Sequence, residues 1–361
     1  MARAVQIKDI AKALGISIGT VDRALHNRGR INPLTKERVL EMARTLGYRP
    51  NQAARALSSK RRLRISVNLP SEIALYWDGV REGIREEASA FQAAGVEVEF
   101  RSFPRLACGE TEAFEAAMSA GVNGMIVATG RPEELRPAIR DAARERVPVV
   151  TISTDAPKTA RLAVVSIDAR ASGSLAGELL GRLLQGQGRL AVVTGDLAIT
   201  DHAEKFESFL SSVGTMFPAI EVVPALQNHE HEIEAYKECK RLLEQYADLG
   251  GIYVTTANST PVLEALKDSG RLEKVQVIAT DLFPRLIEHL ERGNVVATLY
   301  QRPRSQGQLA LRLLYNFLVE GRCPSHQVKL APHLIMKSNL SFFLEKLEPI
   351  SRPLSDFAYG N

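Results

Sequence analysis

Residues 7–25 read IKDIAKALGISIGTVDRAL, and this stretch decides the fold of the N-terminal part of the chain. Apolar residues recur at helical spacing on both sides of Gly15: Ile7, Ile10, Ala11 and Leu14 before it, then Val21, Ala24 and Leu25 after it. Glycine readily adopts the left-handed conformation that ends a helix, and Ser17 is a good N-cap for the next helix. Two short helices joined by a tight turn are therefore predicted.

A third helix is expected from about Thr35 to Gly47, after a polar loop at 26–33. Its inner face holds Val39, Leu40, Ala43 and Leu46. Two helices joined by a tight turn and supported by a third follow the helix-turn-helix plan, in which the second helix reads bases in the major groove. The alternative is a three-helix bundle with no role in nucleic-acid binding.

Charge is distributed unevenly along the 361 residues. Residues 1–64 contain 15 Lys and Arg against four acids, a net charge of +11, whereas the remaining residues carry a net charge of −7. A basic module on a mildly acidic body indicates that one end binds a polyanion. The N-terminus lacks the apolar core of a signal peptide, and no apolar run approaches the ~18 residues of a membrane span. Together with three cysteines (Cys108, Cys239 and Cys323) that form no CxxC pair, this favours a cytoplasmic protein without disulfides or zinc.

The segment after the basic module has the composition of a short helix. Residues 50–58 read PNQAARALS, with proline as a helix starter and three alanines as helix formers. A helix of about two turns is unstable alone in water, so it should order only with support from DNA and a partner chain.

From residue 64 onward, short β-branched runs alternate with longer amphipathic stretches. Strands are predicted at 64–69, 96–100, 124–128, 148–152, 164–167, 190–194, 220–223, 251–255, 275–279 and 296–300. Helices are predicted between them at 77–94, 112–120, 132–145, 172–185, 203–213, 233–246 and 260–269. This alternation predicts an α/β body of parallel sheets covered on both faces, divided into two subdomains. A ligand would bind in the cleft at the carboxyl ends of the strands.

Five stretches of the N-terminal part carry a specific resemblance: IKDIA (7–11), GIS (15–17), TVDRAL (20–25), KERV (36–39) and LGYRPN (46–51). They resemble the DNA-binding headpiece of the lactose-repressor (LacI) family of bacterial transcription regulators. The rest of the chain is similar, more weakly, to the periplasmic-binding-protein-like effector domain of that family. The expected domains are an all-α headpiece (1–50), a hinge (51–63) and a body (64–361). Within the body, 64–168 with 297–327 and 169–296 with 328–361 would form the two subdomains.

The resemblance implies a set of DNA-contacting residues: Ser17, Ile18, Gly19, Thr20, Asp22, Arg23, Arg30, Asn32, Asn51, Arg55 and Leu57. Ile18 and Gly19 occupy the two early reading positions and offer little hydrogen bonding, whereas Arg23 suits guanine or phosphate. Asp22 departs from the usual serine; it either pairs with a nearby arginine or accepts from cytosine. In the family the hinge helices lie in the minor groove, and Leu57 would wedge into the central base step.

Candidate effector contacts follow the ends of the predicted strands: Tyr76, Trp77, Asp155, Asp168, His202, Asn258, Asp281 and Gln301. The resemblance adds Lys205 to this set. The same loops contain Ser153, Thr154, Asp196 and Asp201. Carboxylates, amides and aromatic rings suit a polyhydroxylated ligand, because hydroxyls both donate and accept while the C–H faces stack on rings. The resemblance is strongest at Asn258, Asp281 and Gln301. Lys205 stands where the family often has a sugar-contacting arginine, and Trp77 has a core residue as its alternative.

The most consistent interpretation is a ligand-responsive DNA-binding transcription regulator, with repression as the expected mode of control. It would bind a pseudo-palindromic operator as a homodimer and sense a small sugar or sugar-like molecule, without a cofactor and without a membrane partner. The alternatives are an α/β enzyme and a DNA-binding regulator that does not sense sugar. No enzyme is expected, because P-loop, GxGxxG, GxSxG and HExxH motifs are missing. The run from His229 to Glu232 is interpreted as solvated rather than metal-binding.

Overall fold

The computed structural model describes residues 7–25, 31–46, 62–229 and 231–344. Contacts divide the chain into two units. One comprises 1–62 with 91–96, and the other comprises 63–90 with 97–361. Residues 7–46 are described below as the headpiece and residues 63–344 as the body; residues 91–96 are described with the body because β2, which begins at Val96, belongs to its sheet.

The headpiece contains the three expected helices, α1 (Ile7–Leu14), α2 (Ile18–Leu25) and α3 (Pro33–Thr45). Gly15 adopts a left-handed conformation with φ 64°, which ends α1 as predicted. The helices enclose a small core of Ile10, Ala11, Val21, Ala24, Val39 and Ala43. Leu40 was expected on the inner face of α3, and this was wrong: it is exposed, because it lies one residue past Val39 and turns away from the core.

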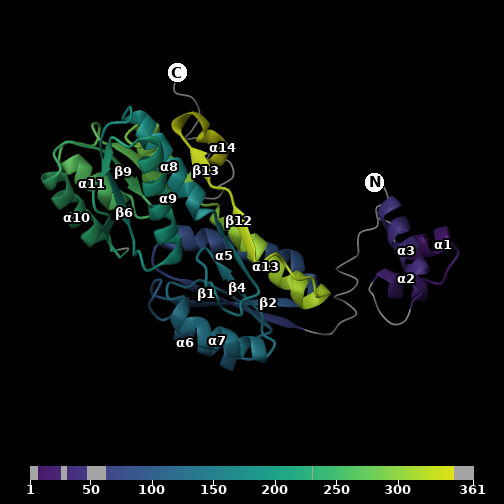
Figure 1. Cartoon of the computed structure of the whole chain (residues 1–361). Coiled ribbons are helices and arrows are strands. Elements are labelled where there is room, and N and C mark those ends of the chain that lie inside the picture. The colour runs from purple at the N-terminus through teal and green to yellow at the C-terminus, as the bar shows by residue number, and fades with distance from the viewer. Residues whose placement is uncertain (1–6, 26–30, 47–61, 230, 345–361) are drawn as a thin grey trace, which may run out of the picture. The chain divides into compact units, whose positions relative to one another are not determined.

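The first subdomain of the body is built on a six-stranded sheet in the order β12-β5-β4-β3-β1-β2. These strands are β1 (Leu63–Pro70), β2 (Val96–Phe103), β3 (Gly124–Val127), β4 (Val149–Ile152), β5 (Ala163–Ile167) and β12 (Gln327–Leu330). Its helices are α5 (Ala74–Phe91), η1 (Gln92–Ala94), α6 (Glu110–Ser119), α7 (Pro132–Arg144) and α13 (Pro303–Glu320). Helices α6 and α7 cover one face of the sheet, and α5 and α13 the other (Figure 1).

The second subdomain contains a seven-stranded sheet in the order β13-β11-β10-β9-β6-β7, with β8 paired to β6. These strands are β6 (Gly188–Thr194), β7 (Ile220–Val222), β8 (Leu226–Gln227), β9 (Leu249–Val254), β10 (Gln276–Thr280), β11 (Ala297–Tyr300) and β13 (His333–Ile335). Its helices are α8 (Ala169–Leu183), α9 (Thr200–Met216), α10 (Glu232–Gln245), α11 (Thr260–Asp268), α12 (Pro284–Arg292), η2 (Lys337–Asn339) and α14 (Ser341–Leu344). Within this sheet β13 runs antiparallel to its neighbour β11, whereas β6 to β11 pair in parallel.

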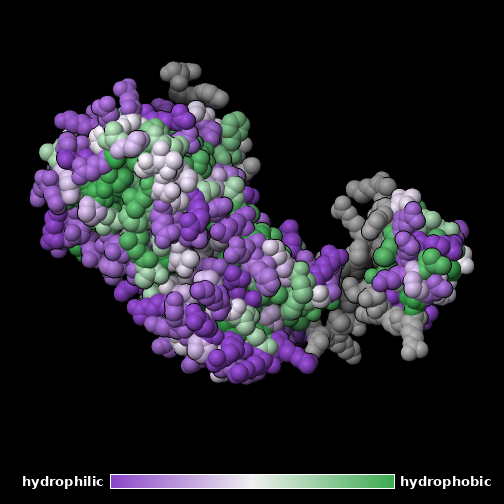
Figure 2. All heavy atoms as spheres, viewed as in Figure 1, coloured by the Kyte–Doolittle hydropathy of each residue, from purple (hydrophilic) through white to green (hydrophobic). Residues whose placement is uncertain are grey.

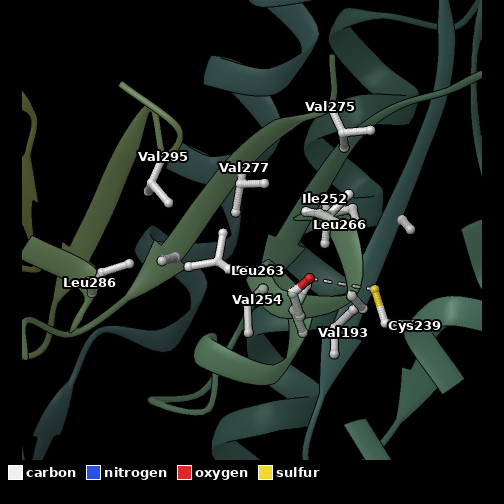
Figure 3. Packing of buried hydrophobic residues seen from close by; sticks show 14 of the residues in the cluster. Val193, Cys239, Ile252, Val254, Leu263, Leu266, Val275, Val277, Leu286 and Val295 are labelled. Carbon is white, nitrogen blue, oxygen red and sulfur yellow. Dashed lines mark hydrogen bonds between the residues drawn. The ribbon is translucent and has the colours of Figure 1, made fainter. Parts of the chain in front are cut away.

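Side chains alternate between the two faces of this second sheet, and both faces are buried. Ile252 and Val254 pack under α10, α11 and α12, where the Cys239 thiol lies 4.0 Å from the Val262 carbonyl (Figure 3). Tyr253, between them in sequence, packs on the opposite side against α8 and α9. Helices on both faces explain why the strands read as continuous apolar runs. On the face of the body seen in Figure 2, hydrophilic residues cover most of the surface and hydrophobic residues form smaller patches.

The chain passes between the two subdomains at two positions that differ from the expected residues 297 and 327. Strand β11 pairs with β10 in the second sheet, so the chain returns to the first subdomain after Tyr300 rather than before residue 297. Strand β12 pairs with β5 along its whole length, so the chain leaves again after Leu330 rather than after residue 327. Pairing of backbone groups across a sheet decided both positions, and the apolar pattern along one strand does not show which neighbour it has.

Candidate DNA-binding face and ligand cleft

The start of α2 presents the expected reading residues to solvent. Ile18 is 56% exposed, and Ser17, Gly19 and Arg23 are exposed as well. The Ser17 hydroxyl accepts a hydrogen bond from the backbone N–H of Thr20 at 3.1 Å, which is the N-cap geometry expected from the sequence. The first turn of α2 thus exposes an apolar side chain and a bare backbone position, and its last turn exposes the guanidinium of Arg23.

The structure describes two of the remaining expected DNA contacts, Asn32 and Asp22. The side-chain oxygen of Asn32 accepts from the backbone N–H of Leu34 at 2.9 Å, so it helps to start α3. Asp22 is half-buried within α2. Four other residues lie outside the described ones, namely Arg30, Asn51, Arg55 and Leu57, and the expected hinge helix falls there too.

A polar pocket lies between the two subdomains at the carboxyl ends of their strands, and we call it the inner pocket. The first subdomain lines it with Ile73, Tyr76, Trp77, Leu106, Ser153 and Thr154. The second lines it with Asp201, His202, Lys205, Thr255, Thr256, Ala257, Asp281 and Gln301. The structure thus brings together six of the nine expected effector contacts: Tyr76, Trp77, His202, Lys205, Asp281 and Gln301.

Lys205 is the buried cation of the inner pocket, with 1% of its side chain exposed. Its Nζ lies 2.7 Å from the Asp201 carboxylate one turn earlier on α9, and it donates to the Gln301 side-chain oxygen at 2.7 Å. It also donates to the Thr255 carbonyl at 3.2 Å. The ion pair and two further acceptors compensate for removing an ammonium from water.

Asp281 is the buried anion beside it. Its two carboxylate oxygens accept from the backbone N–H of Gln301 at 3.0 Å and from the Gln301 side-chain amide at 2.7 Å. Gln301 therefore joins Asp281 to Lys205, since its amide donates to one and its carbonyl accepts from the other. Asp281 has φ 66°, a left-handed conformation that is unusual for a non-glycine residue and that marks a constrained site.

Burial shifts the titration of two groups in opposite directions. It raises the pKa of Asp281 to about 6, because the charged carboxylate is removed from water. It lowers the pKa of His202 to about 4, because the charged imidazolium is disfavoured in the same way. His202 is thus neutral at neutral pH, where its Nδ1 lies 3.1 Å from the Asp196 backbone N.

Tyr76 and Trp77, at the start of α5, form the aromatic wall of the pocket. Their rings lie 4.9 Å apart with an edge-to-face angle of 84°, and both side chains are buried. The Tyr76 hydroxyl lies 2.7 Å from the Ser153 hydroxyl and accepts from the Gln306 amide at 3.2 Å. Trp77 is both packed and pocket-lining, so the two readings of this residue are compatible.

Three expected effector contacts do not line the inner pocket. Asp155 forms a two-pronged ion pair with Arg161, and Asp168 accepts from the Ala171 backbone N–H as the N-cap of α8. Asn258 lines an outer groove, and its amide nitrogen has no hydrogen-bond partner among the described residues. Asp155 and Asp168 follow strands as expected, but a local partner occupies each of them.

Five polar residues of the pocket were not among the nine expected contacts: Ser153, Thr154, Asp201, Thr255 and Thr256. Asp201 was placed in the right loop but not among the expected contacts, although its position one turn before Lys205 is a recognisable ion-pair spacing. Thr255 and Thr256 directly follow β9, where β-branched residues indicate only a strand. Buried Thr256 has a hydroxyl without a hydrogen-bond partner in the described part of the chain.

The inner pocket is narrow, and the outer cleft is wide. The free volume of the inner pocket is about 40 Å³, far below the ~300–1,000 Å³ of typical ligand pockets. Two outer grooves of about 730 and 1010 Å³ flank it, sharing Leu75, Ala257, Phe283 and Pro284. Tyr76 and Asp281 line both the inner pocket and the groove of about 730 Å³, so a ligand in that groove reaches the buried carboxylate.

The position of Lys205 depends on a glycine in the neighbouring helix. A Cβ at Gly173 of α8 would overlap the Lys205 carbonyl and the Ser208 hydroxyl of α9. We expect Gly173→Ala to destabilise the body by about 1–3 kcal/mol, because the two helices must move apart. Gly214→Ala on α9 is the matched control, since a Cβ there meets nothing within 4 Å and alanine favours the helix by up to about 1 kcal/mol. Urea unfolding of the two variants measures both effects; equal stability would contradict the close packing.

Comparison with known proteins gives two family matches. The model described as bacterial regulatory proteins, lacI family, matches residues 6–51, and that of a periplasmic binding protein domain matches residues 66–322. The HTH-type transcriptional regulator DegA of Bacillus subtilis is 28% identical over 249 residues, which cover 67% of this chain and 70% of DegA. Catabolite control protein A of Staphylococcus epidermidis is 25% identical over 336 residues, covering 92% and 97% of the two chains. These relatives are regulators, so the expectation that the chain is not an enzyme is confirmed.

Solved structures resemble the body. GanP, a glucose-galactose binding protein of Geobacillus stearothermophilus, superimposes with a TM-score of 0.71 and 27% identity, covering 78% of this chain and 99% of GanP. A solute binding protein of Burkholderia graminis in complex with D-arabinose has a TM-score of 0.73 and 21% identity, covering 78% and 98%. The second match shows the shared fold.

Two further properties concern the described residues only. None of their helices combines the length and apolar character required to cross a bilayer. They contain no group of three or more His, Cys, Asp or Glu side chains placed to hold a metal ion.

Proposed function

The chain belongs to the lacI family of bacterial regulatory proteins, and from this premise we propose that it is a homodimeric regulator whose operator affinity is set by a small polyhydroxylated ligand in the cleft. Repression is the mode of control that we propose. The observation that carries the proposal is the inner pocket, where buried Lys205, Asp281 and Gln301 meet two aromatic rings at the ends of the strands.

We expect a homodimer because an operator made of two inverted half-sites has two-fold symmetry. A single helix-turn-helix headpiece reads only a half-site, and pairing two of them lengthens the specific interface. Recognition by α2 alone would be thin, because Gly19 has no side chain and Ile18 offers only apolar contact. We therefore propose that Arg23 and the hinge position Leu57 contribute much of the specificity, the latter through minor-groove insertion.

We propose that the cleft couples ligand binding to operator binding. Both subdomains contribute walls to the inner pocket, and its volume of about 40 Å³ is too small for a sugar. A ligand that occupies the adjoining groove of about 730 Å³ and contacts walls from both subdomains favours one arrangement of the subdomains over another. A ligand with different affinities for two arrangements shifts their populations, and operator binding shifts with them.

Selection of operators from random DNA by the full-length protein tests the DNA-binding part of the proposal. The expected product is two inverted half-sites with a fixed spacing. A single asymmetric site bound by one chain would contradict the homodimer.

Ligand affinity is expected to fall as the pH is lowered through about 6. Above that value Asp281 is ionised and accepts hydrogen bonds from hydroxyls, whereas below it the carboxyl is protonated. His202, with a pKa of about 4, does not change charge in this range. Calorimetric titration between pH 5 and 8 measures the effect. An equally steep pH profile in Asp281→Asn would assign the effect to another group.

The stability of the unliganded protein should depend on pH in the opposite direction. The folded pKa of Asp281 lies above its ordinary value near 3.8, so the folded state binds the proton more tightly. The stability contributed by this proton is fully present below pH ~3.8 and is lost as the pH rises through about 6.

A further inference from the structure

The charge and hydrogen-bonding capacity of the cleft limit which ligand it accepts. We propose that the ligand is an uncharged or amine-bearing polyhydroxy compound, and that the cleft rejects phosphorylated and carboxylated compounds of the same skeleton. This inference rests on the proposed function, because it specifies the ligand of the same cleft.

The first step is the state of the buried cation. An ammonium has three N–H donors, and Lys205 directs them to Asp201, Gln301 and Thr255 at 2.7, 2.7 and 3.2 Å. With 1% of the side chain exposed, Lys205 has no donor left for a ligand. An anionic group entering the inner pocket would have to break the ion pair with Asp201 to be neutralised.

The second step is the surplus of acceptors. Each oxygen of Asp281 accepts one hydrogen bond from Gln301, and a carboxylate oxygen has room for about two. Asp201 likewise uses Oδ2 for Lys205. Two aspartates that retain acceptor capacity face a single, fully occupied lysine. A ligand rich in O–H or N–H donors satisfies these acceptors, whereas a phosphate or carboxylate brings more acceptors.

The third step concerns the outer grooves. Together with the inner pocket they are lined by eight Asp and Glu but only four Lys and Arg. Three of those cations face carboxylates: Lys205 pairs with Asp201, Arg304 pairs with Glu86, and Arg285 lies 3.4 Å from Glu264. Arg85 lies over the Phe100 ring at 4.9 Å. From outside the lining, Arg81 pairs with Asp78 and Arg105 with Glu72. Carboxylates still outnumber cations when these two are included, so the path into the cleft carries a net negative charge that disfavours anions.

Identification of the bound compound tests the inference first. Full-length protein is equilibrated with metabolite extracts of bacteria grown on different carbon sources, washed and denatured, and the released compounds are identified by mass spectrometry. We expect an uncharged or amine-bearing polyhydroxy compound. A phosphorylated or carboxylated compound would overturn the inference while leaving ligand sensing intact. Release of no compound from any extract would contradict the proposed function itself.

Calorimetry on a matched series then measures the discrimination. The recovered compound is compared with its phosphate, its carboxylate and its amine on the same skeleton. The phosphate and the carboxylate should bind at least about a hundredfold more weakly, because an added negative charge meets two aspartates at low dielectric. A phosphate that binds as tightly as its parent would overturn the inference. The amine arm distinguishes an uncharged natural ligand from a cationic one.

A variant tests the role assigned to the ion pair. Asp201→Asn removes the counter-charge of Lys205, so the ratio of parent to phosphate affinity should shrink at least about tenfold. Asp141→Asn is the control, since this exposed aspartate on α7 pairs with Arg144 away from the cleft and should leave the ratio unchanged. An unchanged ratio in folded Asp201→Asn would contradict the assignment, and the wild-type series stands independently should this variant fail to fold.

Discussion

Asp281→Ala is expected to abolish the ligand response while operator binding in the absence of ligand stays at the wild-type level. Its carboxylate is the buried acceptor that holds Gln301 through two hydrogen bonds. Removing it deletes a charged acceptor for ligand hydroxyls and releases the Gln301 amide that faces Lys205. Hydrogen bonds to charged groups contribute about 1.5–3 kcal/mol each, so ligand affinity should fall about tenfold to a hundredfold or more.

Asp168→Ala is the matched control for this experiment. Asp168 also follows a strand, but it caps α8 and does not line the inner pocket. Its loss should cost about 1 kcal/mol of stability and leave the ligand response intact. Calorimetry with the cleft ligand and operator titrations measure both variants. A normal response in Asp281→Ala would place the ligand site elsewhere.

Removal of residues 1–62 is expected to abolish operator binding and leave a folded body that still binds ligand. The deletion ends before β1, whose first residue is Leu63, and it removes the helix-turn-helix helices α1 to α3. Specific operator binding typically exceeds non-specific binding by about 10³-fold or more, and the whole of that margin should disappear. The body retains both sheets and every residue of the inner pocket.

Circular dichroism, ligand calorimetry and size-exclusion chromatography measure the outcome of this deletion. A cooperative melting transition and unchanged ligand affinity are expected. An unfolded product would contradict the division of the chain at residue 62. Retained operator binding would show that the body itself contacts DNA.

Much of the fold follows from periodicity alone. Each of the ten predicted strands overlaps an observed strand, because buried parallel strands read as apolar runs bounded by turn residues. The strands that were missed, β8, β12 and β13, are two to four residues long and lie at or near the edges of the sheets. Half-exposed short strands such as β12 carry too few apolar residues to stand out from a loop. Helices α12 and α13 were also not among the predicted ones, although both begin with proline at the first turn.

The sequence predicted where the ligand pocket lies, but not the partners of each side chain in and around it. The rule that ligands bind at the carboxyl ends of parallel strands, together with the resemblance at Lys205, placed six of nine expected residues in one pocket. It could not separate Asp281, which faces the pocket, from Asp155, because the difference lies in a neighbour: Arg161 pairs with Asp155 across a turn. Likewise the sequence suggested Lys205 as a ligand contact, whereas its donors are all directed to protein acceptors. Such pairings depend on three-dimensional partners that spacing does not reveal.

The most direct test of the account is the affinity of full-length protein for its selected operator, measured by fluorescence anisotropy with and without the compound released from the cleft. The compound is used at about 100 times its dissociation constant, so that nearly every cleft is occupied. The account predicts that the operator dissociation constant changes by about tenfold or more, the usual size of coupling between two sites. An operator affinity that stays the same at saturating ligand would contradict it.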